Sequence, residues 1–378
     1  MKKQRIRQIV IGVGLLLFTV LLYFVNQVER DEIMENEGRT FEKAEVVEIL
    51  QDNIQEGGTR NGQQIVKLKI RTGEHKGEIV EATSTSSYLY GADCTVGLKV
   101  IVIISESEDN LSASVYNYDR GNMLYGIVAF FIAMLWIIGG RKGLNSALGL
   151  IFTFVCVIFM FLPMIYRGYS PIFCAILITV IITVVVMYLI DGMTIKSICA
   201  ILGTIAGVTI SALFAYVFGK LTHISGYNVS DIENLDYIGL VTNIRVGELM
   251  FAGILISALG AVMDVAMSVA STINEIHEKN STLSRKELFQ SGINVGKDMM
   301  GTMSNTLILA FTGSSINTLV YIYSYKYNYY QVLNMYDIGI EIIQGISATL
   351  GVILTVPLVA FISAALLKKK NSKVYRLV

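Results

Sequence analysis

The sequence predicts an α-helical polytopic membrane protein of about eight spans with a small extracytoplasmic β-rich domain. Three observations predict this class. The chain of 378 residues is 53% hydrophobic and only 16% charged, with a mean hydropathy of +0.57, whereas soluble domains carry about 25% charged residues. Its apolar residues gather in runs of about 18 or more, which is long enough to cross a hydrocarbon core of about 30 Å. One polar, alternating stretch interrupts these runs near the N-terminus.

The first apolar run, residues 9–25, follows the basic start MKKQRIR. A basic start before an apolar core is also typical of a cleaved signal peptide. The run is long for such a core, and Asn26-Gln27-Val28 lacks the small residues of a cleavage site. We therefore expect residues 1–25 to be an uncleaved N-terminal membrane anchor.

Seven further runs predict the remaining spans, at about 123–139, 145–165, 171–190, 197–218, 247–268, 300–323 and 340–366. Basic residues set the orientation, because cytoplasmic loops are enriched in Lys and Arg. Such residues gather at 2–7, 141–142, 196, 279–297 and 368–376, and the short loops on the other side hold only Arg167, Lys220, Arg245 and Lys326. We expect the bacterial cytoplasmic membrane, with both termini cytoplasmic.

Residues 26–121 should form a separate domain outside the membrane, before a seven-span domain over 122–367 and a basic cytoplasmic tail over 368–378. Short alternating runs, AEVVEIL, QIVKLKIR, GEIVEATS, LKVIVII and SASVYNY, are separated by Gly-rich breaks. This pattern predicts five strands in a small barrel or sandwich, with an OB-like barrel as one option. Such a domain would bind an extracytoplasmic partner or ligand, or act as a rigid spacer over the spans.

Motifs that carry chemistry are scarce. The formal net charge is zero, which gives no reason to expect a nucleic-acid partner. The four cysteines have no metal-ligand spacing, and only Cys94 falls in the outer domain. His277-Glu278-Lys279 lacks the second histidine of a zinc-protease helix. We expect no metal site, no cofactor and no enzymatic activity.

Small residues recur at every fourth position of the run 197–218. They begin with Gly203, Gly207 and Ser211. This spacing lets two helices approach closely within lipid, so we expect these three residues to form a helix-packing seam.

One carboxylate interrupts the span 247–268, where Asp264 follows a long uncharged run. At about 100° per residue, Gly253, Ser257, Gly260 and Asp264 share one face of the helix. A charge at a helix centre costs about 2.5–3.5 kcal/mol on the insertion scale. We therefore expect this face to point away from lipid and into the bundle.

The following helix carries a second polar face, made of Asn294, Lys297, Asp298, Gly301, Asn305, Ile308 and Thr312. Because the two helices are antiparallel, Asp264 and Asn305 should reach the same depth, in the cytoplasmic third of the membrane. In the last span, Glu341 begins a half-polar face. These residues either line an aqueous pathway for a small solute or ion, or Asp264 pairs with Lys297 as a structural staple.

Several segments resemble the YibE/F-like family of bacterial multi-spanning membrane proteins. They are GAVMDVAMSVAS, LSRKELFQSGINVGKDMMGTMSNTLILAFTGSS, GVILTVPLVA and GGRKGL. The resemblance covers about residues 121–366 and implies a bacterial envelope and this span layout. Because members of the family are largely uncharacterised, it implies no catalytic residue.

We expect a transporter or permease of a small solute or ion embedded in the lipid bilayer. Its pathway residues would be Asp264, Asn305, Asp298, Lys297, Ser257 and Glu341. The alternative is a non-transporting envelope factor whose outer domain binds a protein partner. A water-filled path to Asp264 would favour the first, and a dry, close-packed bundle the second.

Overall fold

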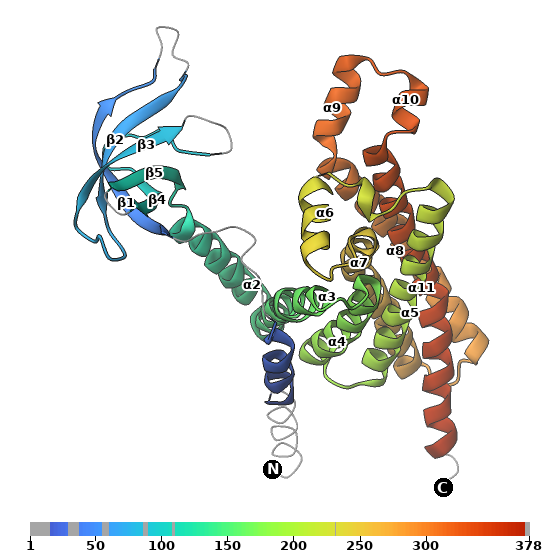
Figure 1. Ribbon diagram of the computed structural model, residues 1–378. Helices are drawn as coiled ribbons and strands as arrows, with labels where there is room; N and C mark the ends of the chain where they lie inside the picture. The colour runs from blue at the N-terminus through green and yellow to red at the C-terminus, as the bar shows by residue number, and fades with distance from the viewer. Residues whose placement is uncertain are drawn as a thin grey trace, which may run out of the picture. The chain divides into compact units, whose positions relative to one another are not determined.

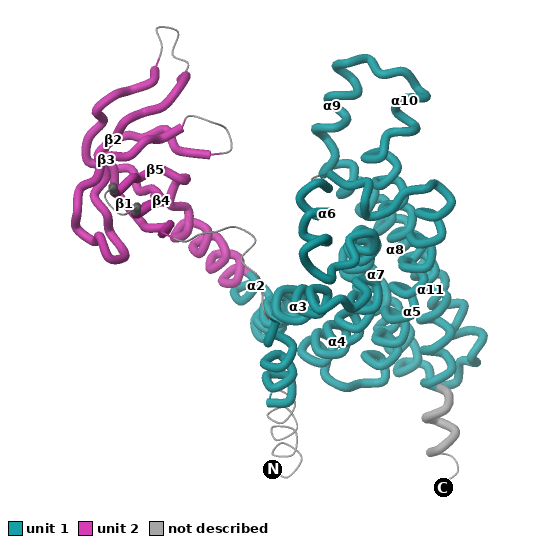
Figure 2. The backbone as a smooth tube through the Cα atoms, viewed as in Figure 1, with its two compact units in different colours: residues 1–28, 135–378 teal, residues 29–134 magenta. Residues whose placement is uncertain are grey.

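The computed structural model describes residues 16–28, 38–54, 60–85, 90–107, 110–230 and 232–374 (Figure 1). The chain divides into two compact units, one of residues 1–28 and 135–378 and the other of residues 29–134 (Figure 2). The second unit contains the strands, and the first contains most of the helices. Most of the expected N-terminal anchor, residues 1–15, lies outside the described residues.

Five strands close into a barrel in the unit 29–134. They are β1 (Arg39–Gln51), β2 (Gln63–Ile70), β3 (Ile79–Thr85), β4 (Lys99–Ser107) and β5 (Asn110–Tyr118). The order around the barrel is β1-β2-β3-β5-β4. β3 and β5 pair parallel, and the remaining neighbours pair antiparallel. The predicted small β-rich domain is confirmed, and its strand order is that of an OB-like barrel.

Alternation along the strands explains the barrel core. Val66, Leu68 and Ile70 of β2 are fully buried, because successive side chains of a strand point to opposite faces. Lys67 lies between two of them and points outward, where its Nζ is 2.7 Å from a carboxylate oxygen of Glu48. Period-two patterning therefore separates the barrel interior from its surface.

A buried amide fastens two segments of the barrel to each other. Gln64 is 0% exposed, and its Nε2 donates to Asp52 at 2.9 Å and to the Cys94 carbonyl at 3.3 Å. Its Oε1 accepts from the Cys94 backbone N–H at 2.8 Å. Each polar atom of this buried side chain is thus paired, as burial requires.

The unit of residues 1–28 and 135–378 is called the helical unit below; the start of α2, residues 121–134, belongs to the unit 29–134. The helices that follow the barrel in sequence are α2 (Gly121–Cys156), α3 (Leu162–Tyr166), α4 (Pro171–Asp191), α5 (Ile195–Thr222), α6 (Ile232–Val241), α7 (Val246–Lys279), α8 (Arg285–Ser314), α9 (Ile316–Tyr325), α10 (Tyr329–Leu333) and α11 (Tyr336–Val374). A π turn (Val157–Phe161) joins α2 to α3, and a 3-10 turn (Gly226–Asn228) precedes α6. Ser170, Thr194 and Ser284 cap the starts of α4, α5 and α8 by accepting backbone N–H groups.

Within the described residues, five helices are long and apolar enough to cross a membrane. They are Gly121–Tyr166, Pro171–Asp191, Ile195–Thr222, Val246–Lys279 and Tyr336–Leu367. α8 and α9 pass the same criteria only together, and they meet at a bend of 62°. The predicted span 300–323 is therefore not one straight helix. The described part of the first span is a short apolar helix, Leu16–Asn26.

The first of these five helices is interrupted at Gly140. This residue has φ 54° and ψ −133°, a left-handed conformation that glycine adopts most readily. The helix is sharply kinked here, since a Cβ on Gly143 would lie 1.9 Å from the Leu135 carbonyl oxygen. The two predicted runs 123–139 and 145–165 lie on either side of this turn.

Small residues bring α5 against α11. A Cβ added to Gly203 would lie 2.0 Å from Val359, and one added to Gly207 would lie 1.8 Å from the Thr355 hydroxyl. Ser211 meets Gly351, whose added Cβ would lie 2.8 Å from the serine Cβ. The contacts run in opposite directions along the two helices, so α5 and α11 are antiparallel. Removing side chains at this seam lets the helix backbones approach closely.

Candidate functional site

The bend between α8 and α9 lies at Ser315. Its backbone N–H donates to the Phe311 carbonyl at 3.3 Å, and the hydroxyl of the preceding Ser314 donates to the same carbonyl at 2.7 Å. These bonds satisfy part of the last turn of α8. Beyond the bend, α9 and α10 project past the end of α8 (Figure 1). Interrupted helices of this kind are tolerated at membrane depth where protein or a cavity surrounds them.

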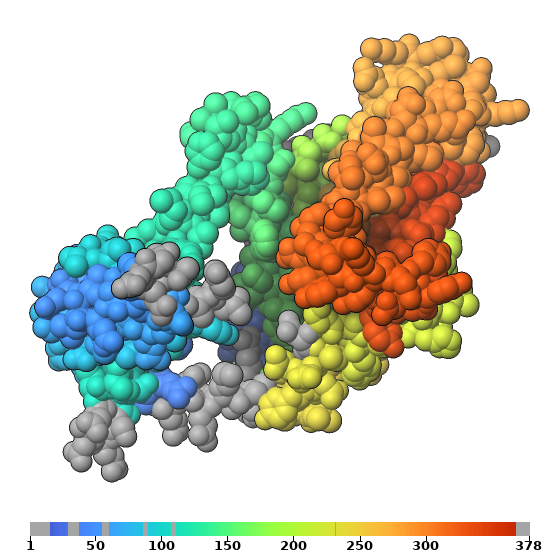
Figure 3. All heavy atoms as spheres, turned by 90° about the horizontal axis from the view of Figure 1, so that it is seen from above, coloured from blue at the N-terminus to red at the C-terminus, as the bar shows by residue number. Residues whose placement is uncertain are grey.

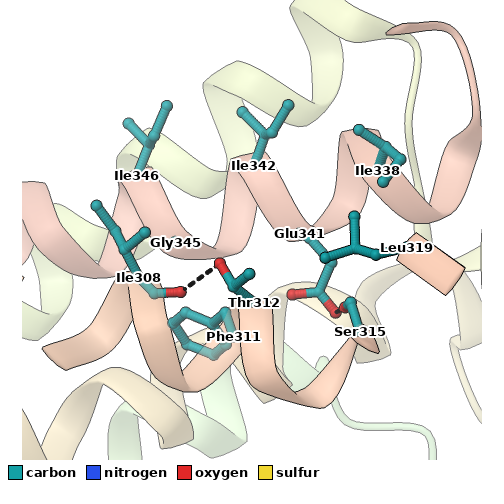
Figure 4. A pocket seen from close by; sticks show the side chains of 10 residues that line it. All are labelled: Ile308, Phe311, Thr312, Ser315, Leu319, Ile338, Glu341, Ile342, Gly345 and Ile346. Atoms are coloured by element: carbon teal, nitrogen blue, oxygen red, sulfur yellow. Dashed lines mark hydrogen bonds between the residues drawn. The ribbon is translucent and has the colours of Figure 1, made fainter. Parts of the chain in front are cut away.

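Glu341 of α11 lies beside this bend (Figure 4). The Ser315 hydroxyl donates a hydrogen bond to Glu341 Oε1. Glu341 Oε2 is buried and has no hydrogen-bond partner among the described residues. Because buried polar atoms are nearly always paired, an unpaired carboxylate oxygen inside a span indicates a place for a ligand or proton.

A cavity of about 250 Å³ opens between α8, α9 and α11 next to this carboxylate. Its walls are mainly apolar and include Ile308, Phe311, Leu319, Ile338, Ile342 and Ile346. Thr312 also lines it, and its hydroxyl donates to the Ile308 carbonyl at 2.8 Å (Figure 4). A water molecule occupies about 30 Å³ in the liquid. The cavity therefore has room for a small ion with part of its hydration shell.

The chemistry of this cavity suits a positive charge. Carboxylate and hydroxyl oxygens are ligands for small cations, and a carboxylate also carries a proton. α8 ends at the cavity, so the negative end of its dipole lies close to Glu341. A cation or a proton would balance both negative groups, whereas an anion would be repelled.

Asp264 lies on the outer side of α7, contrary to the expectation that its face points into the bundle. The exposed residues of this face are Gly253, Ser257, Gly260 and Asp264. Ile273 lies on the side of α7 that packs against α8, because a Cβ added to Gly292 of α8 would lie 2.5 Å from Ile273 Cδ1. Asp264 is about 180° around the helix from Ile273 and so points away from α8. The buried positions of α7 are mostly alanine, valine, leucine and isoleucine. These apolar side chains fill the bundle interior, and the polar face of α7 points away from it.

The polar stripe of α8 also points away from the other helices of the bundle. Asn294, Lys297, Asp298, Gly301, Asn305, Ile308 and Thr312 are all exposed, and of these Ile308 and Thr312, near the end of α8, line the cavity beside Glu341. α8 instead packs through the opposite side, where a Cβ on Gly296 would lie 2.1 Å from Val356 of α11. In the described part of the chain, no ion pair or hydrogen bond connects Asp264 with this stripe. The structure therefore does not bring the two faces together, and the staple between Asp264 and Lys297 is not formed.

A second hollow of about 760 Å³ lies at the other end of the bundle, beside the turns that precede α5 and follow α7. Lys196, Asn274, His277 and Glu278 are among its lining residues. Lys196 pairs with Asp191 at 3.1 Å, and the Asn274 amide donates to Glu278 at 2.9 Å. Several of its polar groups are thus already engaged within the chain, in contrast to the free oxygen of Glu341.

The barrel has an ionic contact centred on His75, in the turn between β2 and β3. Its Nδ1 is 3.1 Å from Glu78 and its Nε2 is 2.6 Å from Glu106. Hydrogen bonds with Glu106 and then Glu78 raise the pKa of His75, because both carboxylates stabilise the protonated ring. Such a contact cannot be predicted from the sequence, because Glu106 lies 31 residues away on β4.

Of the predicted pathway residues, Glu341 lies in a cavity, and Asp264, Asn305, Asp298, Lys297 and Ser257 lie on exposed helix faces. Sequence reasoning missed Ser315, the partner of Glu341. The run Gly313-Ser314-Ser315 could have indicated a break, since small polar residues weaken a helix. Serines are common within membrane helices, however, so this signal is weak.

These features define a polytopic helical membrane protein with an appended β-barrel domain and a carboxylate at a helix break. The chain belongs to the YibE/F-like protein family, which it matches over residues 127–369. The match confirms the resemblance carried by the segments around Asp264 and Lys297, and the barrel strands lie outside it. No curated protein and no solved structure matches the chain.

Proposed function

We propose that the protein is a transporter or permease of a small ion, with Glu341 as the residue that binds it. The free, buried Oε2 of Glu341 in the cavity at the α8–α9 bend carries this proposal. Helices interrupted within a span are a recurring way to bind a coupling ion in transporters, because the C-terminal end of the first half lies at the ion. The transported species is a proton or a small cation, because the cavity offers negative groups and little space.

The proposal includes a layout in the bacterial cytoplasmic membrane. About eight spans, with both termini cytoplasmic and the barrel outside, fit the distribution of Lys and Arg. In this layout the Glu341 cavity lies toward the outer surface and the hollow near His277 toward the cytoplasm. Reporters fused after Glu106 and at Val378 test it: the first should be active outside the cell and the second inside. A reporter at Val378 that is active outside the cell would contradict this layout, because an even number of spans returns the chain to the side on which it starts.

The function can be tested by rescue of a deletion strain across a panel of metal ions, pH values and metabolites. A condition that impairs the deletion strain should be rescued by the wild-type chain and not by Glu341→Gln, which keeps the shape and loses the charge. Glu248→Gln is the matched control, because Glu248 also accepts a hydrogen bond from a serine, Ser170, and does not line the cavity beside Glu341. Full rescue by Glu341→Gln would contradict the proposal.

The second candidate function is a non-transporting envelope factor whose barrel binds another protein. An exposed aromatic pair on the barrel favours it: Phe41 is 55% and Tyr116 42% exposed, with ring centroids 5.3 Å apart in an edge-to-face arrangement. Exposed aromatic residues are enriched where proteins bind one another. Replacing both with serine should abolish rescue under this function and leave it intact for a transporter. Ile79→Ser, at another exposed apolar position of the barrel, is the control.

A further inference from the structure

The outer face of α8 lies on the periphery of the helical unit. α8 packs on α7 and α11 through Gly292 and Gly296, whose added Cβ atoms would clash with Ile273 and Val356. The polar stripe lies on the opposite side, and nothing lies within 4 Å of a Cβ added to Gly301, in the middle of it. Figure 3 shows the orange spheres of α8 along one edge of this unit.

This outer face lies at membrane depth. A Cβ added to Gly296 would lie 2.1 Å from Val356 of α11, so these two residues are at the same depth. A Cβ added to Gly345 of α11 would lie 3.8 Å from the Phe311 ring, so this pair is also at one depth. Both α11 positions fall inside the apolar span Tyr336–Leu367. The segment of α8 between them, which carries Lys297, Asp298 and Asn305, is therefore at bilayer depth as well.

Lipid is a poor cover for such a face. Each charged side chain near a helix centre costs about 2.5–3.5 kcal/mol on the insertion scale. In agreement with this, α8 passes the criteria for a membrane span only in combination with α9. Charged residues at this depth normally face protein or water. The outer face of α8 should therefore be covered by protein or water that the described residues of the chain do not supply.

We propose that a second copy of this chain covers the outer face of α8, forming a twofold-symmetric dimer. The charge pattern of the face is self-complementary. Around the helix, Lys297 lies about 50° to one side of the stripe centre and Asp298 about 50° to the other side. A twofold axis along the membrane normal places each flank against the opposite flank of the second copy. Lys297 of each copy then faces Asp298 of the other, at nearly the same depth.

The centre of the stripe also suits a self-association. Asn294 and Gly301 are seven residues apart, and Asn305 follows four residues later, which fits the heptad repeat of a left-handed helix pair. Gly301 allows the two backbones to approach closely. Asn305 carries both a donor and an acceptor, so its amide can pair with the same amide of the second copy.

Other occupants predict different outcomes. A different membrane protein would be expected to complement Lys297 and Asp298 with charges of its own, and it would copurify in place of a second copy. A water-filled groove would leave the chain monomeric. In the twofold dimer, Lys297 and Asp298 of the two copies neutralise one another, so no charge from another protein is needed. This proposal concerns the oligomeric state and does not depend on whether the protein transports an ion.

The test measures the mass of the full-length protein in lipid nanodiscs or mild detergent. The wild-type chain should be a dimer. Lys297→Asp and Asp298→Lys should each lose the dimer, because each creates like charges across the interface, and the double variant should regain it. Gly253→Leu, at an exposed glycine of α7 with nothing within 4 Å of its Cβ position, should remain dimeric. A monomeric wild type, or a double variant that stays as dissociated as the single ones, would overturn the proposal.

A cross-link in native membranes covers the case in which the charge variants fold poorly. The four native cysteines are buried, so Asn305→Cys adds one exposed thiol at the stripe centre. Mild oxidation should join two copies through Asn305→Cys at high yield. Gly253→Cys on the outer face of α7 should give no such product. Equal cross-linking of both variants, or of neither, would contradict an interface through α8.

Discussion

The hydroxyl of Ser315 donates a hydrogen bond to Glu341 across the bend between α8 and α9. This bond orients the carboxylate so that its second oxygen, Oε2, remains free at the cavity. Ser315→Ala should therefore weaken ion binding without removing the charge. Hydrogen bonds to charged groups contribute about 1.5–3 kcal/mol, so we expect a loss of roughly tenfold or more in apparent affinity for the ion.

Ser314→Ala is the matched control for this change. The Ser314 hydroxyl donates to the Phe311 carbonyl rather than to Glu341, so its loss should leave the affinity close to that of the wild type. Ion-dependent rescue of the deletion strain, measured over a range of ion concentrations, compares the two variants. Equal effects of Ser314→Ala and Ser315→Ala would show that the ion affinity depends on the bend itself and not on the hydrogen bond from Ser315 to Glu341.

The seam between α5 and α11 should tolerate no side chain at Gly207. A Cβ there would lie 1.8 Å from the Thr355 hydroxyl and 2.8 Å from Val262. Gly207→Leu should destabilise the helical unit by about 1–3 kcal/mol or more, as overpacked interiors do. Thermal unfolding in detergent measures this, with Gly253→Leu as a control because that position faces open space. Similar melting temperatures for both variants would contradict the seam.

The buried amide of Gln64 should hold the barrel segment that contains Cys94. Gln64→Leu leaves the Cys94 backbone N–H without its acceptor, which costs about 1–3 kcal/mol. The Cys94 thiol reports the change. Burial raises the pKa of the Cys94 thiol, so it reacts slowly in the wild type.

Maleimide labelling of Cys94 at neutral pH should accelerate in Gln64→Leu as the segment opens. Gln63→Leu provides the control, because Gln63 is the exposed neighbour on the same strand. Peptide mapping assigns the label to Cys94 among the four cysteines. Unchanged labelling in Gln64→Leu would show that this amide does not hold the segment in place.

The His75 contact makes the stability of the barrel depend on pH. Glu106 and Glu78 raise the folded-state pKa of His75 above the unfolded value of about 6.5. The stabilisation is therefore complete below the unfolded pKa and is lost as the pH rises through the folded pKa. His75→Gln should remove this part of the dependence. Protease resistance of the barrel in the full-length protein, compared between about pH 6 and 8, measures it. An identical pH profile in His75→Gln would contradict the contact.

Much of the fold can be predicted from the sequence, because it follows from periodicity. Strands alternate, so runs such as QIVKLKIR locate β2, and the spacing of Gly203, Gly207 and Ser211 is that of a helix seam. The structure confirms the helical membrane class, the small barrel and the family. These features depend on local pattern, which one sequence contains in full.

The direction of the polar faces could not be predicted in the same way. The position of Asp264 on the helix defines a face, but it does not say whether the face meets the chain's own helices, water or another chain. Gly292 and Gly296 of α8 determine which sides of α7 and α8 face the bundle, because they let α8 pack closely against α7 and α11. The break at Ser315 was also missed, because no proline marks it.

Ion flux into vesicles reconstituted with the purified protein tests whether Glu341 binds a transported ion. Wild-type vesicles should take up protons or a small monovalent cation faster than protein-free vesicles when a membrane potential is applied. Glu341→Gln should reduce this flux at least tenfold with an unchanged melting temperature, because the carboxylate that holds the ion is gone, and Glu248→Gln should retain it. Equal flux through the wild type and Glu341→Gln, or wild-type flux no greater than that of empty vesicles for each of these ions, would contradict the account.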